Sequence, residues 1–253
     1  MGLSASSCRF ATKCRFFRKL LKKRPRKDVQ LSDQGKKPME KESIHRLLEH
    51  IELHGLQTEG IYRKPGSVKG MRELRQQLEK DPMAVCLEDY PIHCVTGLVS
   101  EWLRNLPEPL TTFSQYSGFL HAMEPPEKSE QLGRISQVLD MLPPASIDML
   151  ERLFFHLVRV ASEEGHNRMS THSLAIVFAP SILRPPNTTN PLDIMKDMSK
   201  ITMCLELILN EQKRRYEELN EGEENEIMAN CISLTPCRLY RAQGQNDLDT
   251  IPH

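Results

Sequence analysis

Apolar residues recur every three to four positions along most of the chain, and this spacing constrains its fold more than any other feature. Residues 41–53, KESIHRLLEHIEL, place Ile44, Leu47, Leu48 and Ile51 at positions i, i+3, i+4 and i+7. That spacing puts the four side chains on one face of an amphipathic helix. No segment alternates apolar and polar residues convincingly, as an exposed strand would. The sequence therefore predicts an all-α protein.

Eight segments show this helical pattern, and we expect them to form one domain over residues 38–216. Gly55 follows the first segment at a C-cap position, and Ser67 precedes the second as an N-cap. Several of the breaks between segments carry proline, which ends or kinks a helix. The segments are 41–53, 67–80, 92–106, 114–123, 129–142, 143–164, 170–183 and 191–219, the last either continuous or broken once.

Composition excludes several classes of protein. No apolar run reaches the roughly 18 residues that span a bilayer, and the N-terminus has no apolar stretch typical of a secretory signal. The seven cysteines are scattered, odd in number and never form C-x-x-C, which argues against a disulfide framework or a zinc knuckle. We therefore expect reduced cysteines and a cytoplasmic protein.

The formal net charge is zero, but the charges are unevenly placed. Residues 1–30 contain ten Lys and Arg against one acid, Asp28, and the rest of the chain carries the opposite excess. We interpret residues 1–37 as a basic tail with its own partner, an anionic membrane surface in the first instance. Residues 217–253 begin with an acidic run, and we expect a frayed helix end followed by disorder.

One turn stands out between the first two predicted helices. Residues 58–67, TEGIYRKPGS, place Arg63 just before a Pro-Gly pair. Pro65 and Gly66 suit the two central positions of a type II turn, in which the glycine takes a positive φ. This stiff turn would project Arg63 outward. Residue chemistry alone leaves Arg63 open as a functional group or an ordinary solvated charge.

Three motifs in a fixed order carry a resemblance to a known family. They are GLQTEGIYRKPGS, WLRNLPEPL and NRMSTHSLAIVFAPSILRPP, separated by helical spacers. Together they resemble the GTPase-activating domain for Rho-type small GTPases, the RhoGAP domain, over about residues 45–212. Within that family, TEGIYRK, LERLFFHLVR and AIVFAPSILR look most similar to the version in class IX unconventional myosins.

The resemblance implies a role for several residues. Arg63 matches the arginine finger that the family inserts into the active site of a GTP-bound GTPase, and Lys64 adjoins it. Arg104 matches an arginine that braces the finger loop by bonding to its backbone. Asn167, with Arg168 and Met169, matches a segment expected near the GTPase or supporting the finger. The family needs no cofactor of its own, because Mg²⁺ and GTP belong to the partner.

Three positions depart from the family pattern. Ser100 replaces a lysine that usually faces the GTPase, and Ser173 replaces an asparagine that often touches it. Pro65 stands where relatives carry a small polar residue. The changes keep an alternative open, a weak or inactive Rho-binding scaffold module. Elsewhere, His50 and His54 are spaced as a metal pair, but without a third ligand nearby we expect surface histidines and no metal site.

The N-terminus carries a candidate lipidation signal. MGLSASSC fits M-G-x-x-x-[ST], so Gly2 is a candidate for myristoylation, with Cys8 and Cys14 as palmitoylation candidates. Stable anchoring requires two signals, and the basic cluster supplies another. The alternatives to an anchor are a nuclear-localisation-like run and an accidental N-terminus from splicing. A third function for the whole protein is a membrane-curvature or lipid-binding adaptor dominated by residues 1–30. We expect no nucleic-acid binding, since no nucleic-acid fold is recognisable.

Overall fold

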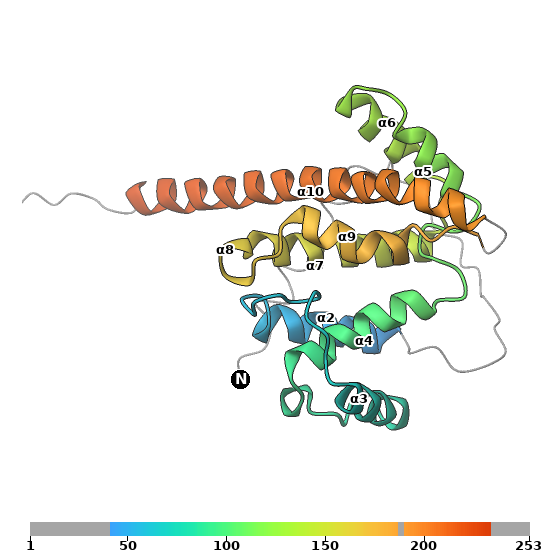
Figure 1. The fold of residues 1–253 in the computed structure, drawn as a ribbon. Coiled ribbons are helices and arrows are strands. Elements are labelled where there is room, and N and C mark those ends of the chain that lie inside the picture. The colour runs from blue at the N-terminus through green and yellow to red at the C-terminus, as the bar shows by residue number, and fades with distance from the viewer. Residues whose placement is uncertain (1–40, 187–189, 234–253) are drawn as a thin grey trace, which may run out of the picture. The chain divides into compact units, whose positions relative to one another are not determined.

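The computed structural model describes residues 41–186 and 190–233 (Figure 1). Described residues up to Arg214 belong to one compact unit and those from Arg215 to a second. The described residues form helices and no strand, so the predicted all-α class is confirmed. The elements are α2 (Lys41–His54), α3 (Val68–Lys80), the 3₁₀ helix η1 (Leu87–Asp89), α4 (Ile92–Asn105), α5 (Tyr116–Ala122), α6 (Lys128–Leu139), α7 (Pro144–Ser162), α8 (Glu164–Asn167), α9 (Thr171–Ile182) and α10 (Pro191–Ser233).

All eight predicted helices are present, and the ends of the first seven differ only slightly from the prediction. The short elements η1 and α8 were not predicted, because three or four residues carry no periodic signal. The prediction for the last helix was wrong in its extent. α10 runs unbroken to Ser233, through the acidic run that we expected to fray. Glutamate is a good helix former, and no proline interrupts residues 192–233.

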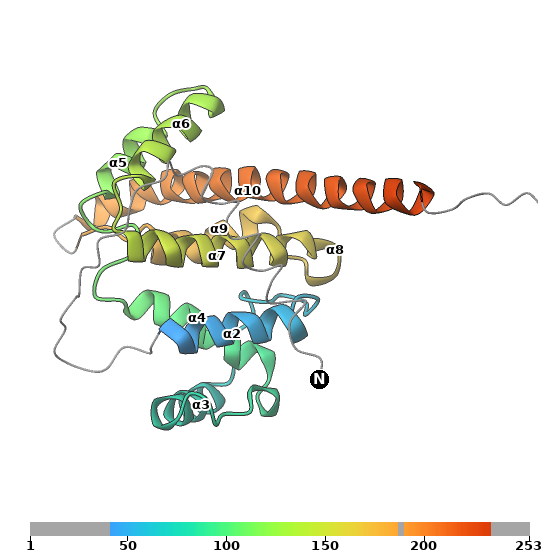
Figure 2. The ribbon, with the colours of Figure 1, turned by 180° about the vertical axis from the view of Figure 1, so that it is seen from behind.

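Within the first unit, α2, α4, α7 and α9 pack together around the loop that carries Arg63. α2 packs on α4 and on α7, and α9 packs on both α4 and α7. α3 packs on the opposite side of α4, as Figures 1 and 2 show from two sides. The predicted stripe of α2 is fully buried between these helices; it consists of Ile44, Leu47, Leu48 and Ile51.

The loop after α4 is held by a side chain that lies 80 residues further along the sequence than Arg104. Arg184, just after α9, donates to the backbone oxygens of Arg104 at 2.6 Å and Leu106 at 2.5 Å. Its guanidinium also lies 5.5 Å from the centre of the Phe113 ring. These carbonyls belong to the C-terminal end of α4, which has no internal partners for them. Arg184 therefore caps α4 and fixes the loop that follows.

The prediction of a type II turn around Gly66 was wrong. The expected type II turn at residues 64–67 does not form, and Gly60, not Gly66, has a positive φ of 70° in this loop. Gly66 is required for another reason, since a Cβ there would lie 2.4 Å from the carbonyl oxygen of His93 in the first turn of α4. The predicted N-cap is confirmed: Ser67 begins α3 and accepts a hydrogen bond from the Gly70 amide.

A pair of glycine substitutions tests this close approach. We expect Gly66→Ala to destabilise the domain by about 1–3 kcal/mol, because the new methyl group forces the loop away from α4. Gly133→Ala is the matched control: nothing lies within 4 Å of its Cβ in the middle of α6. It should raise stability by about 0.5–1 kcal/mol through helix propensity. Urea unfolding measures both, and equal effects of the two substitutions would contradict this role of Gly66.

Candidate functional site

The loop of residues 58–67, here called the Arg63 loop, presents one arginine to solvent on an ordered backbone. Arg63 is exposed, whereas Tyr62 before it is buried, with 8% of its surface accessible. The amides of Arg63 and Lys64 both donate to the carbonyl of Gly60, at 2.9 and 2.8 Å. Gly60 and Tyr62 both adopt positive φ, at 70° and 67°. The loop is therefore a tight turn with Arg63 at its outer edge.

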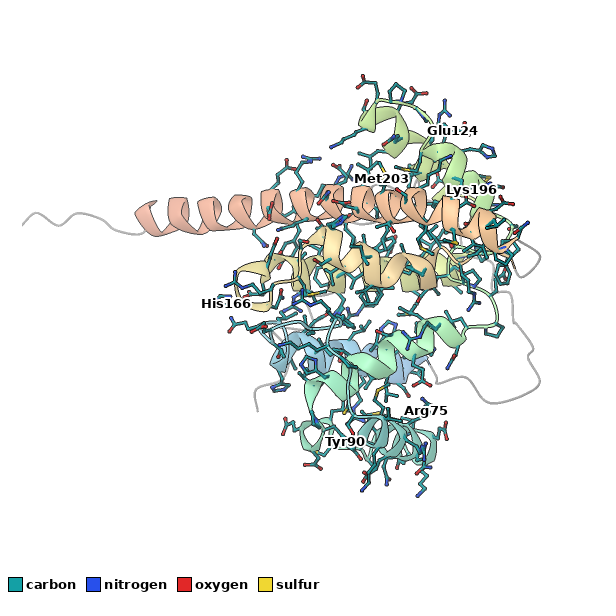
Figure 3. The ribbon with its side chains drawn as sticks, in the orientation of Figure 1. Arg75, Tyr90, Glu124, His166, Lys196 and Met203 are labelled. Atoms are coloured by element: carbon teal, nitrogen blue, oxygen red, sulfur yellow. The ribbon has the colours of Figure 1, made fainter. Side chains whose placement is uncertain are left out.

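Asn167 holds this loop from the end of α8. The backbone carbonyl of Asn167 accepts from the Gly60 amide at 2.8 Å. Its side-chain nitrogen donates to the carbonyls of Leu56 and Val160, both at 2.7 Å, and its side-chain oxygen accepts from the Met169 amide at 2.8 Å. Asn167 is fully buried, so in this structure it supports the loop and offers no surface to a partner. Figure 3 labels its neighbour His166 on α8.

The Tyr62 side chain anchors the loop in the core. Its hydroxyl lies 2.6 Å from Nε2 of His156 on α7. Its ring packs edge-on against Phe178 of α9, with the ring centres 4.9 Å apart. Positive φ is rare for a bulky residue and costs about 1–3 kcal/mol. Contacts with both α7 and α9 offset that strain.

Behind His156, a buried carboxylate collects three basic side chains. Oε1 of Glu52, on α2, lies 2.9 Å from Nδ1 of His156. Glu52 accepts hydrogen bonds at 2.7 Å from Arg152 on Oε1 and from Arg159 on Oε2. The side chains of Glu52, Arg152 and His156 are almost completely buried, while that of Arg159 is 30% exposed. The Glu52 cluster, comprising Glu52, Arg152, His156 and Arg159, thus joins α2 to α7.

The pKa shifts within the cluster determine which of its atoms carry protons. Burial raises the pKa of Glu52, but the hydrogen bonds from His156 and Arg152 and the charge of Arg152 outweigh burial and lower it to about 2. Burial lowers the pKa of His156, against the opposing effect of Glu52. An ionised carboxylate can only accept, so Nδ1 of neutral His156 donates to Glu52. Nε2 then accepts from the Tyr62 hydroxyl, and the chain of hydrogen bonds is complete.

Three cations act on one carboxylate, Glu59, at the outer face of the loop. Lys64 pairs with Glu59 at 3.1 Å, and the Lys64 side chain lies over Gly60. The hydrogen bond and charge of Lys64 lower the pKa of Glu59, with smaller contributions from Arg63 and Arg168. Arg63, Lys64 and Arg168 are all exposed. Three cations around one carboxylate make this face suited to an anionic ligand.

The residues expected on α4 lie apart from this contact network. Ser100 is half-buried, and Arg104 is exposed near the C-terminal end of α4. The predicted hydrogen bond from Arg104 to the Arg63 loop is not among those of the described residues. Arg104 stands eleven residues, about three helical turns, beyond His93, where Gly66 touches α4. The support that the structure shows comes from Asn167 and His156 instead.

The remaining candidate residues are placed as follows. Ser173 is half-buried in the first turn of α9, where its amide donates to the N-cap hydroxyl of Ser170 at 3.1 Å. His50 and His54 stack with ring centres 4.8 Å apart, and the described residues contain no cluster able to hold a metal. Gly2, Cys8 and Cys14 lie outside the described residues. Within the described part of the chain, no helix has the length and apolar character needed to cross a membrane.

Sequence reasoning missed the Glu52 cluster, although the sequence carries a signal for it. Glu52 follows Leu48 at i+4, on the flank of the buried stripe of α2. Arg152, His156 and Arg159 repeat at i, i+4 and i+7 within the long, largely apolar segment that forms α7. Charged residues on an apolar helical face are seldom buried without a partner. An acid on one apolar face and bases on another therefore indicate a buried ion cluster.

The sequence matches the model of the RhoGAP domain over residues 42–187, which contain the Arg63 loop, Asn167 and the Glu52 cluster. The chain belongs to the RhoGAP domain family. The predicted resemblance is thereby confirmed, and the family implies Rho-family small GTPases as partners. It supports a GTPase-activating function in general terms.

Individual relatives agree with this assignment. Unconventional myosin-IXb of Rattus norvegicus is 55% identical over 190 residues, which cover 74% of this chain and 10% of the myosin. Beta-chimaerin of Mus musculus is 30% identical over 168 residues, covering 65% of this chain and 50% of that protein. The chain thus spans about a tenth of the myosin and about half of the chimaerin.

A solved structure shows the same fold. The crystal structure of human Rho GTPase activating protein 15 superposes with a TM-score of 0.62 at 32% identity. The match covers 67% of this chain and 81% of that one. The RhoGAP fold is therefore established for this domain by sequence and by structure together.

The Glu52 cluster predicts how the stability of the domain depends on pH. A histidine whose pKa is lowered in the folded state binds a proton less readily there than in the unfolded chain. The free energy of unfolding therefore falls as the pH drops below the unfolded value of 6.5. Glu52 adds a second loss as the pH falls from 4.5 towards 2. We expect the thermal midpoint to fall by several degrees between pH 7.5 and 5.

Scanning calorimetry at a series of pH values measures this dependence. His156→Gln should lower the thermal midpoint at pH 7.5. It should also make the midpoint depend less on pH between 6.5 and 5, because glutamine does not titrate. His121→Gln replaces an exposed histidine on α5 and should leave the slope unchanged. A wild-type midpoint that is constant from pH 7.5 to 5 would contradict the assignment of a buried, neutral His156.

Proposed function

We propose that this protein accelerates GTP hydrolysis by Rho-family small GTPases and that Arg63 is the group it inserts into their active site. The observation that carries the proposal is the contrast between neighbours, an exposed Arg63 directly after a buried, anchored Tyr62. Such a backbone holds the arginine outward before a partner arrives. Preorganisation of this kind lowers the entropic cost of reaching the transition state.

The chemistry of arginine fits this role. Hydrolysis of GTP builds negative charge on the phosphate oxygens, and a guanidinium placed there stabilises that charge. Arginine remains charged at any relevant pH and offers a planar array of donors. Lys64 and Arg168 extend the positive face next to it. The protein needs no cofactor of its own for this step, because GTP and Mg²⁺ are bound by the partner GTPase.

A second function is favoured by one specific observation, the lack of a cation at Ser100. Ser100 lies half-buried on α4, where the family usually carries a lysine facing the GTPase. Pro65, exposed in the Arg63 loop, is a further departure. With a weakened contact face, the domain would bind Rho GTPases as a scaffold without accelerating hydrolysis. Single-turnover kinetics distinguish the two functions, because only an activator changes the rate.

Removal of Arg63 tests the proposal directly. GTP hydrolysis by Rho and Rac is followed in single turnovers with saturating wild-type protein, Arg63→Ala or Arg134→Ala. We expect Arg63→Ala to lose on the order of 10³-fold or more in acceleration, as for other GTPase-activating arginines. Arg134→Ala, on the exposed face of α6, should match the wild type. No acceleration by the wild type, or equal acceleration by all three, would refute the proposed role.

The departure at Ser100 gives a separate prediction. Ser100→Lys restores a cation to the contact face, and a single charge-assisted contact contributes about 1.5–3 kcal/mol. The concentration of domain that gives half-maximal acceleration should therefore fall about tenfold. Ser136→Lys on α6 adds the same charge away from the Arg63 loop and should have no effect. If both substitutions act equally, the gain reflects net charge and not the position of Ser100.

We also propose that residues 1–30 direct the domain to the cytoplasmic face of an anionic membrane, where prenylated Rho proteins reside. The support is the sequence alone: a myristoylation pattern at Gly2, Cys8 and Cys14 as further acylation candidates, and a basic run at residues 13–27. In cell fractionation, Gly2→Ala should move most of the protein from membranes to the soluble fraction. Ser7→Ala leaves the pattern intact and serves as control. Retention of Gly2→Ala on membranes at the wild-type level would reject the acyl anchor.

A further inference from the structure

The conformation of Tyr62 requires an explanation that burial alone does not supply. Tyr62 is a bulky residue at φ 67°, a region that such side chains rarely adopt. Its ring is held against Phe178, but a ring contact is equally available to phenylalanine. The hydroxyl makes the contact that only tyrosine can make, at 2.6 Å from His156. The strained backbone and the specific hydrogen bond occur in the residue directly before Arg63.

We propose that Tyr62, His156 and Glu52 form a positioning relay that sets the direction of Arg63, and that protonation of His156 weakens the relay. This inference rests on the proposed function, since it concerns how Arg63 reaches its working position. None of the three residues touches the partner's nucleotide in this account. They act through the backbone of the Arg63 loop.

The relay works through the geometry of consecutive residues. The Tyr62 hydroxyl donates to Nε2 of His156, and Nδ1 of His156 donates to Glu52 at 2.9 Å. Glu52 is fixed in turn by Arg152 and Arg159, each at 2.7 Å. Without this anchor the Tyr62 backbone can relax towards negative φ, which redirects the next residue. A small misplacement of a catalytic group lowers the rate more than it lowers the affinity.

The groups around His156 determine what a proton does there. Glu52 faces it from α2, Tyr62 from the Arg63 loop, and Arg152 and Arg159 from its own helix α7. Protonation adds a further positive charge next to two arginines that share one carboxylate. It also turns Nε2 into a donor, so the Tyr62 proton must find another acceptor in a buried site. Burial already disfavours the charged form of His156 and lowers its pKa.

A single-atom substitution isolates the relay. Tyr62→Phe removes the hydroxyl and keeps the ring that packs on Phe178. The matched control is Tyr116→Phe, which removes the hydroxyl of another buried tyrosine. That hydroxyl forms a partly buried hydrogen bond of 3.1 Å with Asp197 on α10, away from the Arg63 loop. Both variants lose one hydrogen bond from a mostly buried tyrosine, so a general loss of stability affects both.

The experiment measures single-turnover GTP hydrolysis by Rho or Rac, whichever the wild type accelerates more, across concentrations of each variant. We expect Tyr62→Phe to lower the maximal rate about threefold to tenfold while the half-saturating concentration changes less than twofold. Tyr116→Phe should keep the wild-type maximal rate. Thermal midpoints recorded on the same samples show whether the two variants lose comparable stability.

The dependence of the acceleration on pH distinguishes the relay from a purely structural role of Tyr62. Acceleration by the wild type, divided by the intrinsic rate of the GTPase at each pH, should decline at a pH below 6.5, where the folded protein takes up the proton on His156, while its circular dichroism stays constant. Tyr62→Phe should lack this decline, because the bond that responds to His156 is absent. Tyr116→Phe should retain it.

The outcomes separate the relay from the proposed function. If the wild type and Tyr62→Phe share one maximal rate and one pH profile while Arg63→Ala abolishes acceleration, the relay is wrong and the function stands. If the wild type accelerates neither GTPase, both are wrong. Should Tyr62→Phe fold poorly, the wild-type profile alone decides: a profile that stays flat down to the pH at which the protein unfolds overturns the relay.

Discussion

The buried carboxylate of Glu52 is the interaction on which the rest of the site depends. It lies where α2 meets α7 and is compensated by two arginines and a histidine, all within 2.9 Å. A buried charge is tolerated only with such compensation, and removal of one partner from a cluster of this kind costs about 3–5 kcal/mol. The cluster therefore fixes the spacing of two helices, and its last member, His156, extends that order to Tyr62 in the Arg63 loop.

The Arg63 loop is held on three sides, and each side uses a different kind of contact. Tyr62 inserts a side chain between α7 and α9, Gly60 bonds to the backbone of Asn167, and Gly66 lies directly against the first turn of α4. The outer edge, with Arg63, Lys64 and Pro65, remains exposed. A flexible side chain on a fixed backbone is the arrangement that an inserted catalytic arginine requires.

The sequence predicted the helices and the exposed arginine, but not the way the loop is held. Periodicity located every α-helix of the described residues except the short α8, because each buries an apolar stripe. Turn chemistry placed Ser67 at the start of α3. The same chemistry misassigned Gly66, since a close approach to His93 depends on a helix 26 residues further along the chain. The bond between Glu52 and His156 joins residues 104 positions apart. Local patterns cannot pair such positions, although misplaced charges on apolar faces identify them as candidates.

Amide hydrogen exchange in the Arg63 loop tests the central claim that the buried cluster orders this loop before any partner binds. The amides of Arg63 and Lys64 both donate to Gly60 and report the turn directly. The account predicts that both exchange slowly in the isolated wild-type protein and at least about tenfold faster in Tyr62→Phe, with no change in Tyr116→Phe. Rapid exchange in the wild type, or equal protection in Tyr62→Phe, would contradict it.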